Sequence, residues 1–193
     1  MMRKIKTALI SVSDKSNLKP ILQILKKYNV KIISSGGTYK KIKKLKFSCF
    51  EVSDFTNSPE ILEGRVKTLH PKIHAGILNK RNNKTHLNEL KKNNFENIDL
   101  VIVNFYPFEK TLETTNNHNK IIENIDVGGP TMVRSAAKNY NDVTVVISTD
   151  QYQELINEMN KYNGATSLKF REKLSRTAFT ETAYYDSIIS RYF

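Results

Sequence analysis

Hydrophobic and polar residues recur along the chain with two periods, one typical of β-strands and one typical of α-helices. Short apolar runs rich in β-branched residues predict five strands, at residues 7–12, 30–35, 48–53, 98–106 and 143–149. Between these runs, apolar residues recur every three or four positions, as at Leu18, Ile21 and Leu25, which predicts helices with one buried face. The helical period spans residues 18–28, 39–46, 85–92, 120–125, 130–138, 151–161 and 167–193.

The order of these segments predicts the fold class. Strands that are apolar throughout are buried on both faces, as in parallel sheets whose crossover helices cover both sides. We therefore expect one α/β domain over residues 1–193, a three-layer structure with a mostly parallel sheet and helices on both faces. Only the helical period follows residue 149, which predicts a C-terminal helical extension.

Composition excludes several classes of protein. The 193 residues suffice for a sizeable core, and the shares of hydrophobic residues (39%) and charged residues (26%) are those of a globular protein. No apolar run is long enough to cross a bilayer, and the N-terminal segment lacks a secretory cleavage site. The single cysteine, Cys49, excludes an internal disulfide and indicates a reducing compartment. We expect a cytoplasmic protein with no membrane partner.

The net charge of +12 requires an anionic partner or a solvated lysine-rich surface. The densest basic run, residues 39–46, places lysines around Ile42 and Leu45, which is typical of a helix with a solvated outer face. No recognition helix, zinc finger or aromatic RNA-binding pattern accompanies the charge, so we expect no nucleic-acid partner. We attribute part of the charge to an anionic small-molecule substrate.

The ends of the first two predicted strands form the first candidate site. Ligands of open parallel sheets bind beyond the carboxyl ends of the strands. The second strand ends in SSGGT (34–38), whose backbone amides at a helix start would hold a phosphate. The residues expected to contribute are Ser11, Ser13, Lys15, Ser35, Gly37 and Thr38. Alternatively, Ser13 only caps the first helix, and both roles can hold together.

The segment GRVKTLHPKIHAG (64–76) is the second candidate site. Arg65 and Lys67 alternate across Val66, so an extended segment would present both cations on one face, beside the hydroxyl of Thr68. Flanking glycine and proline favour a fixed shape for this segment. The alternative is a solvated loop.

The same segment contains two histidines, but we expect no metal site. Pro71 argues against a regular helix here, so His70 and His74 are not expected to form the same-face pair of a helical zinc site. No glutamate accompanies them as zinc-protease chemistry requires.

The third candidate site combines NFYPF (104–108) with IDVGGPTMVRSAAKN (125–139). Tyr106 ends a buried strand and would lie either at the floor of the crevice or in the core. Asp126 precedes two glycines and Pro130, so it stands just outside a helix start. The alternative to a role in the site is that Asp126 only caps this helix. Lys138 follows on the same predicted helix.

Together these stretches resemble the IMP cyclohydrolase domain of the bifunctional AICAR transformylase/IMP cyclohydrolases. The resemblance covers essentially the whole chain, and its most specific parts are RVKTLHPK and IDVGGPTMVRSAAKN. It implies a methylglyoxal-synthase-like fold and dehydrative closure of formyl-AICAR to IMP, the last step of purine biosynthesis, by a cyclic amidine hydrolase without cofactor or metal. The transformylase domain is absent from this chain, which could be the N-terminal half of a longer bifunctional protein. The resemblance leaves open whether the protein forms a homodimer.

The resemblance also implies roles for individual residues. Substrate binding would involve Ser11, Ser13, Lys15, Ser35, Gly37, Thr38, Arg65, Thr68, Asn104 and Gly128, and the catalytic residues would be Lys67, Tyr106, Asp126 and Lys138. Lys67 would stabilise or protonate the formyl oxygen, Asp126 would accept a proton from the carboxamide, and Lys138 would assist electrostatically.

The sequence departs from the family pattern at a few positions. These are Asn57-Ser58 in place of a Gly-aromatic pair, Ala75 in place of glycine, and Tyr140 in place of histidine. They leave the cations of the second candidate site unchanged.

Two alternatives with the same fold remain. One is a non-catalytic effector-binding module like that of carbamoyl phosphate synthetase, and the other is methylglyoxal synthase. An effector-binding module has no need of both Lys67 and Asp126, which favours the cyclohydrolase.

Overall fold

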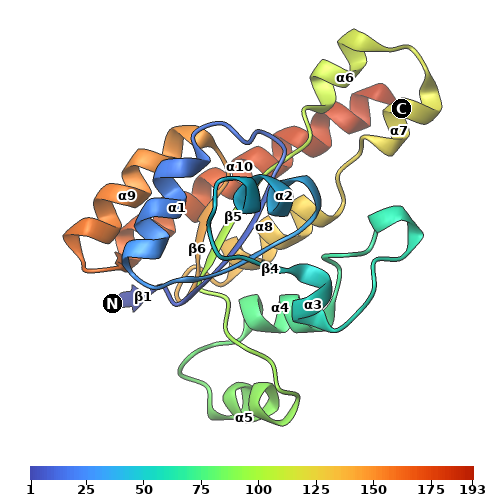
Figure 1. Cartoon of the computed structure of the whole chain (residues 1–193). Coiled ribbons are helices and arrows are strands. Elements are labelled where there is room, and N and C mark those ends of the chain that lie inside the picture. Colours follow the sequence, from blue (N-terminus) through green and yellow to red (C-terminus); the bar gives the residue numbers. More distant parts are fainter.

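A five-stranded parallel sheet forms the centre of the computed structural model, which describes residues 1–193 (Figure 1). Its strands are β2 (Thr7–Val12), β3 (Lys31–Ser34), β4 (Phe50–Glu51), β5 (Leu100–Asn104) and β6 (Thr144–Val146). They lie in the order β4-β3-β2-β5-β6, with every neighbouring pair parallel. Because β2 has β3 on one side and β5 on the other, the connections leave in opposite directions there and open a crevice at the carboxyl ends.

Helices cover the sheet and extend beyond it. They are α1 (Leu18–Lys27), α2 (Gly36–Lys44), α3 (Val52–Thr56), α4 (Pro71–Leu78), α5 (Lys84–Lys92), α6 (Phe108–Thr114), α7 (His118–Glu123), α8 (Gly128–Lys138), α9 (Tyr152–Lys161) and α10 (Leu168–Tyr192), with 3-10 turns η1 (Leu62–Gly64) and η2 (Thr149–Gln151). Figure 1 shows α1 and α9 to one side of the strands and α8 to the other. None of these helices has the length and apolar character needed to span a membrane.

The core lies where the expected apolar runs meet. Leu100 to Val103 of β5 are at most 1% exposed, and Leu9 and Ile10 of β2 are completely buried. The amphipathic α1 buries Leu18, Ile21, Leu22, Ile24 and Leu25 in the same cluster. The expected three-layer, mostly parallel α/β fold with a C-terminal helix is therefore confirmed.

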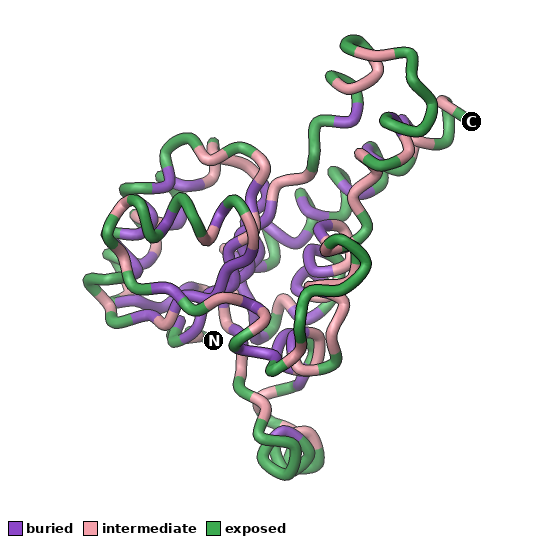
Figure 2. Tube along the Cα trace, turned by 45° about the vertical axis from the view of Figure 1, so that its right-hand side comes forward, coloured by how far each residue is buried: buried purple, intermediate pink, exposed green.

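The C-terminal half of α10 projects away from the sheet beside α6 and α7 (Figure 2). Much of this projecting part is exposed, but Phe108, Ile121, Tyr185 and Ile188 form a small buried cluster between the three helices. The last helix thus joins the sheet to a satellite core that lies next to the carboxyl end of β5.

Two expectations about local structure were wrong. Residues 48–53 contain only a two-residue strand, because the chain turns into α3 at Val52. Pro71 does not prevent a helix but begins α4, since its fixed φ and missing N–H suit the first helical position. His70 caps this helix: its Nδ1 accepts a hydrogen bond of 3.0 Å from the Lys72 amide.

A second, antiparallel sheet was not expected from the sequence. It pairs β1 (Met2–Lys4) with β7 (Ala165–Ser167), two strands of three residues each. Strands this short show no recognisable period, and their pairing links the N-terminus to the segment that precedes α10.

A buried arginine joins this small sheet to α10. Arg171 is 0% exposed, and its guanidinium donates hydrogen bonds to the carbonyls of Tyr140, Thr166, Asn141 and Met1 at 2.8, 2.5, 3.0 and 3.2 Å. Burial lowers the pKa of Arg171 to about 10, so the side chain remains charged at neutral pH. The arginine therefore closes the N-terminal strand, the turn before β6 and the last helix into one unit.

We predict that Arg171→Met lowers the free energy of unfolding by about 3 kcal/mol, because it leaves buried carbonyls without a donor. Arg176→Met is the matched control, since Arg176 is exposed on the same helix. Denaturant unfolding of both variants measures the effect. Equal stability of the two variants would show that the buried arginine is not needed.

Candidate functional site

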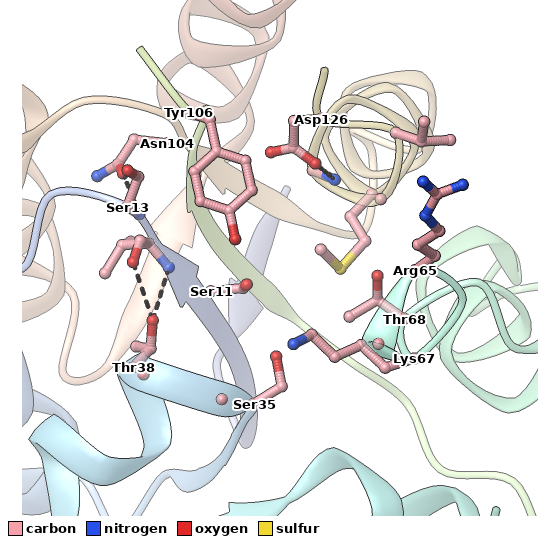
Figure 3. A pocket seen from close by; sticks show the side chains of 18 of the residues that line it. Ser11, Ser13, Ser35, Thr38, Arg65, Lys67, Thr68, Asn104, Tyr106 and Asp126 are labelled. Atoms are coloured by element: carbon pink, nitrogen blue, oxygen red, sulfur yellow. Dashed lines mark hydrogen bonds between the residues drawn. The ribbon is translucent and has the colours of Figure 1, made fainter. Parts of the chain in front are cut away.

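A cleft of about 520 Å³ opens at the carboxyl ends of β2, β3 and β5. The expected site residues that line it are Ser11, Ser13, Lys15, Ser35, Gly37, Thr38, Arg65, Lys67, Thr68, Asn104, Tyr106, Asp126 and Gly128. Figure 3 shows many of these side chains facing one space from segments that are far apart in the sequence. The three candidate sites of the sequence thus form one cleft.

Lys138 is the one expected site residue that the structure does not bring to the cleft. It is exposed in the last turn of α8, whereas the cleft borders the first turn of that helix. A helix rises about 1.5 Å per residue, so the length of α8 separates the two ends. The single chain therefore does not bring Lys138 to the cleft, and its electrostatic role stays a prediction.

The start of α2 forms one end of the cleft. Ser35 stands at the N-cap position, and Gly36 adopts a positive φ of 53°, so the first backbone amides of the helix face the cleft without a side chain between them. Lys15 reaches the same place: a Cβ on Gly37 would lie 3.3 Å from its Cε. Free amides, a helix dipole and an ammonium group together favour a phosphate here.

Two polar side chains hold this end of the cleft in shape. The Thr38 hydroxyl accepts a hydrogen bond from the Val12 amide and donates one to the Val12 carbonyl, both at 3.0 Å. The Asn104 carbonyl oxygen accepts from the amides of Ser13 and Asp14 at 2.6 and 2.9 Å. Because both side chains are engaged with the backbone, they shape the site, and the hydroxyl proton of Thr38 is not free for a ligand.

The cations of the second candidate site lie on a turn. Residues 65–68 follow η1 as a turn, so the condition of an extended segment, under which the two cations would share one face, does not hold. Nevertheless Arg65 and Lys67 both line the cleft. Arg65 pairs with Glu123, and the Lys67 ammonium lies 3.1 Å from a Glu60 carboxylate oxygen.

These two acidic partners were missed by the sequence analysis. Glu60 lies in a loop and Glu123 on α7, and neither belongs to a motif that would signal a site. Both carboxylates are about half exposed, at 48% and 56% of the side chain, so an anionic ligand can replace them at the cations.

Asp126 lies at the start of α8, across the cleft from the start of α2 (Figure 3). One carboxylate oxygen accepts a hydrogen bond of 2.8 Å from the Gly129 amide, so the capping reading is confirmed, and the same carboxyl group lines the cleft. Burial raises the pKa of Asp126, although the amides of Gly129 and Tyr106 work against this by favouring the ionised form. A partly desolvated carboxylate of this kind is a stronger base than an exposed one.

The two glycines of α8 permit this close packing. A Cβ on Gly129 would lie 2.3 Å from an Asp126 carboxylate oxygen, and one on Gly128 would lie 2.5 Å from the Thr68 hydroxyl. Thr68 is only 5% exposed, so the Arg65–Thr68 turn is fixed against the helix start. The glycines therefore set the distance between the cationic turn and the carboxylate.

Tyr106 follows the end of β5 and is 50% exposed. It lines the cleft, as the first of the two expected positions implies, and its exposure excludes the alternative of a core aromatic. Its ring stands between the Ser13 side and the Asp126 side in Figure 3.

Neither histidine of the second segment takes part in the cleft. His74 packs on α8, with its Nδ1 3.1 Å from the Ser135 hydroxyl. The structure contains no group of three or more His, Cys, Asp or Glu side chains arranged to hold a metal ion.

Two family models match successive parts of the chain. The family model of the MGS-like domain matches residues 17–131, and that of the AICARFT/IMPCHase bienzyme matches residues 136–193. The chain is 51% identical over 186 residues to the bifunctional purine biosynthesis protein PurH of Prochlorococcus marinus and 47% identical over 188 residues to that of Clostridioides difficile. It spans 96–97% of its own length but only 36% of theirs.

One solved structure shares the fold over the same extent. The crystal structure of ForH matches with a TM-score of 0.85 and 28% sequence identity, covering 96% of this chain and 97% of that one.

The raised pKa of Asp126 predicts how stability depends on pH. At neutral pH, Asp126→Asn should unfold at the same temperature as wild type or a higher one, because the variant buries no charge. Since folding favours the protonated carboxyl, wild type should gain stability relative to the variant as the pH falls through the raised pKa toward the ordinary value of 3.8.

Thermal unfolding across this pH range measures the effect. The control is Asp99→Asn, which should lower the Tm, because Asp99 accepts hydrogen bonds from the Lys6 and Thr7 amides and pairs with Arg81. An Asp126→Asn variant that is clearly less stable at neutral pH would mean that this carboxylate stabilises the fold.

Proposed function

Because this chain belongs to the MGS-like domain family, we propose that its cleft is the active site of an IMP cyclohydrolase, which closes the ring of formyl-AICAR to give IMP and water. The observation that carries the proposal is the meeting of three groups in one cleft: the amides of α2, the ammonium of Lys67 and the carboxylate of Asp126. Similarity to PurH proteins and to the AICARFT/IMPCHase bienzyme supports the same assignment.

In this proposal the substrate's ribose phosphate binds at the start of α2. The first amides of the helix and the Lys15 ammonium supply donors and positive charge, while Ser11, Ser13 and Ser35 offer hydroxyls. Thr38 and Asn104 act indirectly, by holding the loop after β2. Binding energy from the phosphate then positions the base at the far end of the cleft.

Asp126 is the proposed proton acceptor. The carboxamide nitrogen is a poor nucleophile, and it becomes reactive when it loses a proton as it attacks the formyl carbon. A desolvated carboxylate with a raised pKa can take this proton, and the Gly129 amide holds it in place. The new bond joins this nitrogen to the formyl carbon and closes the six-membered ring.

Lys67 is the proposed partner of the formyl oxygen. This oxygen gains negative charge as the ring closes. It then leaves as water when its bond to carbon breaks and the formamide nitrogen forms a double bond to that carbon, and its two protons are those lost by the carboxamide and formamide nitrogens. A positive group that faces the developing charge lowers the barrier, and Arg65 adds a second cation on the same turn. Thr68 and Tyr106 line the space between the cations and Asp126, where the base would be gripped.

Removing either reacting group tests the proposal. Lys67→Ala and Asp126→Asn should each lower kcat for conversion of formyl-AICAR to IMP by about 100-fold or more, because each removes charge stabilisation or proton transfer from the transition state. The absorbance of IMP follows the reaction, and circular dichroism checks that both variants fold.

The control is Lys92→Ala, at an exposed lysine at the end of α5, which should react like wild type. Normal turnover in either cleft variant would remove that residue from the mechanism. Wild-type protein that binds the nucleotide without ring closure would instead support an effector-binding module.

The phosphate site has its own test. Lys15→Ala should raise KM about tenfold, since a charge-assisted hydrogen bond contributes about 1.5 kcal/mol, and should change kcat by less than about threefold. Steady-state kinetics separate the two constants. Lys19→Ala, an exposed lysine in the first turn of α1, is the control. An unchanged KM in Lys15→Ala would place the phosphate elsewhere.

A further inference from the structure

Asp126 is held from both sides, and the second contact comes from the far end of the chain. Its carboxylate accepts from the Gly129 amide, while its own backbone N–H donates a hydrogen bond of 2.8 Å to the hydroxyl of Tyr185 on α10. The two residues are 59 positions apart. The hydroxyl and the Gly129 amide thus fix the backbone and the side chain of the same residue.

The ring of Tyr185 is fixed by aromatic packing. It is 5% exposed, and its centroid lies 5.0 Å from that of Phe105 and 6.4 Å from that of Phe108. Phe105 directly precedes Tyr106, so the same ring supports both the Tyr106 wall and the Asp126 wall of the cleft. The ring itself packs among apolar side chains and does not line the cleft.

Packing alone does not explain why this residue carries a hydroxyl. A phenylalanine would fill the cluster of Phe108, Ile121 and Ile188 with no polar atom to desolvate. The hydroxyl is matched instead to the Asp126 amide, which would otherwise lack a partner. Burial, together with the nearby charges of Asp126 and Asp186, raises the pKa of Tyr185 to about 12, so the hydroxyl stays neutral across the working range.

We propose that Tyr185 is a positioning residue for the ring-closing reaction, which holds the backbone at Asp126 so that its carboxylate faces the substrate carboxamide. The inference rests on the proposed cyclohydrolase function. Tyr185 itself does not touch the reacting atoms in this account. It couples the last helix to the base of the cleft, and the start of α2 at the phosphate end is independent of it.

Tyr185→Phe tests the proposal with a single-atom change. The variant keeps the ring and loses the acceptor, so kcat should fall about tenfold or more while KM stays within about threefold, because the phosphate site is unaffected. Hydrogen exchange at the Asp126 amide, followed by NMR, should be at least tenfold faster than in wild type. Tyr184→Phe is the matched control, because its hydroxyl bonds Glu109 at 2.8 Å and should leave kcat unchanged.

The outcomes separate this role from others. A smaller fall in kcat, a parallel rise in KM, or an equal loss in Tyr184→Phe would overturn it, since each would indicate no role or a general effect on the fold. Unchanged exchange at the Asp126 amide would overturn it as well. If wild type forms no IMP, the proposed function fails, while the exchange measurement still decides whether the hydroxyl holds Asp126.

Discussion

The parallel pairing of β2 with both β3 and β5 determines where every functional group of this protein lies. The register places Ile10 beside Ser34 on one side and beside Ile102 on the other, so the three strands end at nearly the same level. Loops that are far apart in the sequence therefore leave the sheet side by side. Hydrogen bonds from Thr38 to Val12 and from Ser13 to Asn104 then connect these strand ends directly.

Charge is distributed along the cleft in a way that suits its proposed chemistry. Helix amides and Lys15 lie at one end, and Arg65 and Lys67 lie on a turn that is fixed against α8, from which the Lys67 ammonium reaches to 3.2 Å from the position of a Cβ on Gly36. The carboxylate of Asp126 faces this positive region without an ion pair to either cation, and burial raises its pKa. A base and a cation that stabilises developing negative charge can therefore act on one bound molecule, because the fold does not pair them with each other.

Much of this arrangement could be predicted from the sequence. The runs TALISV and DLVIVN are apolar throughout, which identified the central strands, and the glycines and hydroxyls that follow strands identified most of the cleft. Errors arose where one local rule competed with another. Pro71 was taken as a helix breaker but begins α4, and residues 48–53 were taken as a strand, although the chain turns into α3 at Val52. Lys138 was assigned by resemblance alone. Tyr185 gave no signal, because the contact that matters crosses 59 residues and its neighbours are those of an ordinary core aromatic.

A crystal structure of the chain with bound IMP is the most direct test of the central claim, that one nucleotide spans the cleft. The account predicts that the phosphate binds the first amides of α2 and Lys15, and that the base lies between Lys67 and Asp126. A phosphate that makes no contact with the first amides of α2, or a base turned away from Asp126, would contradict it.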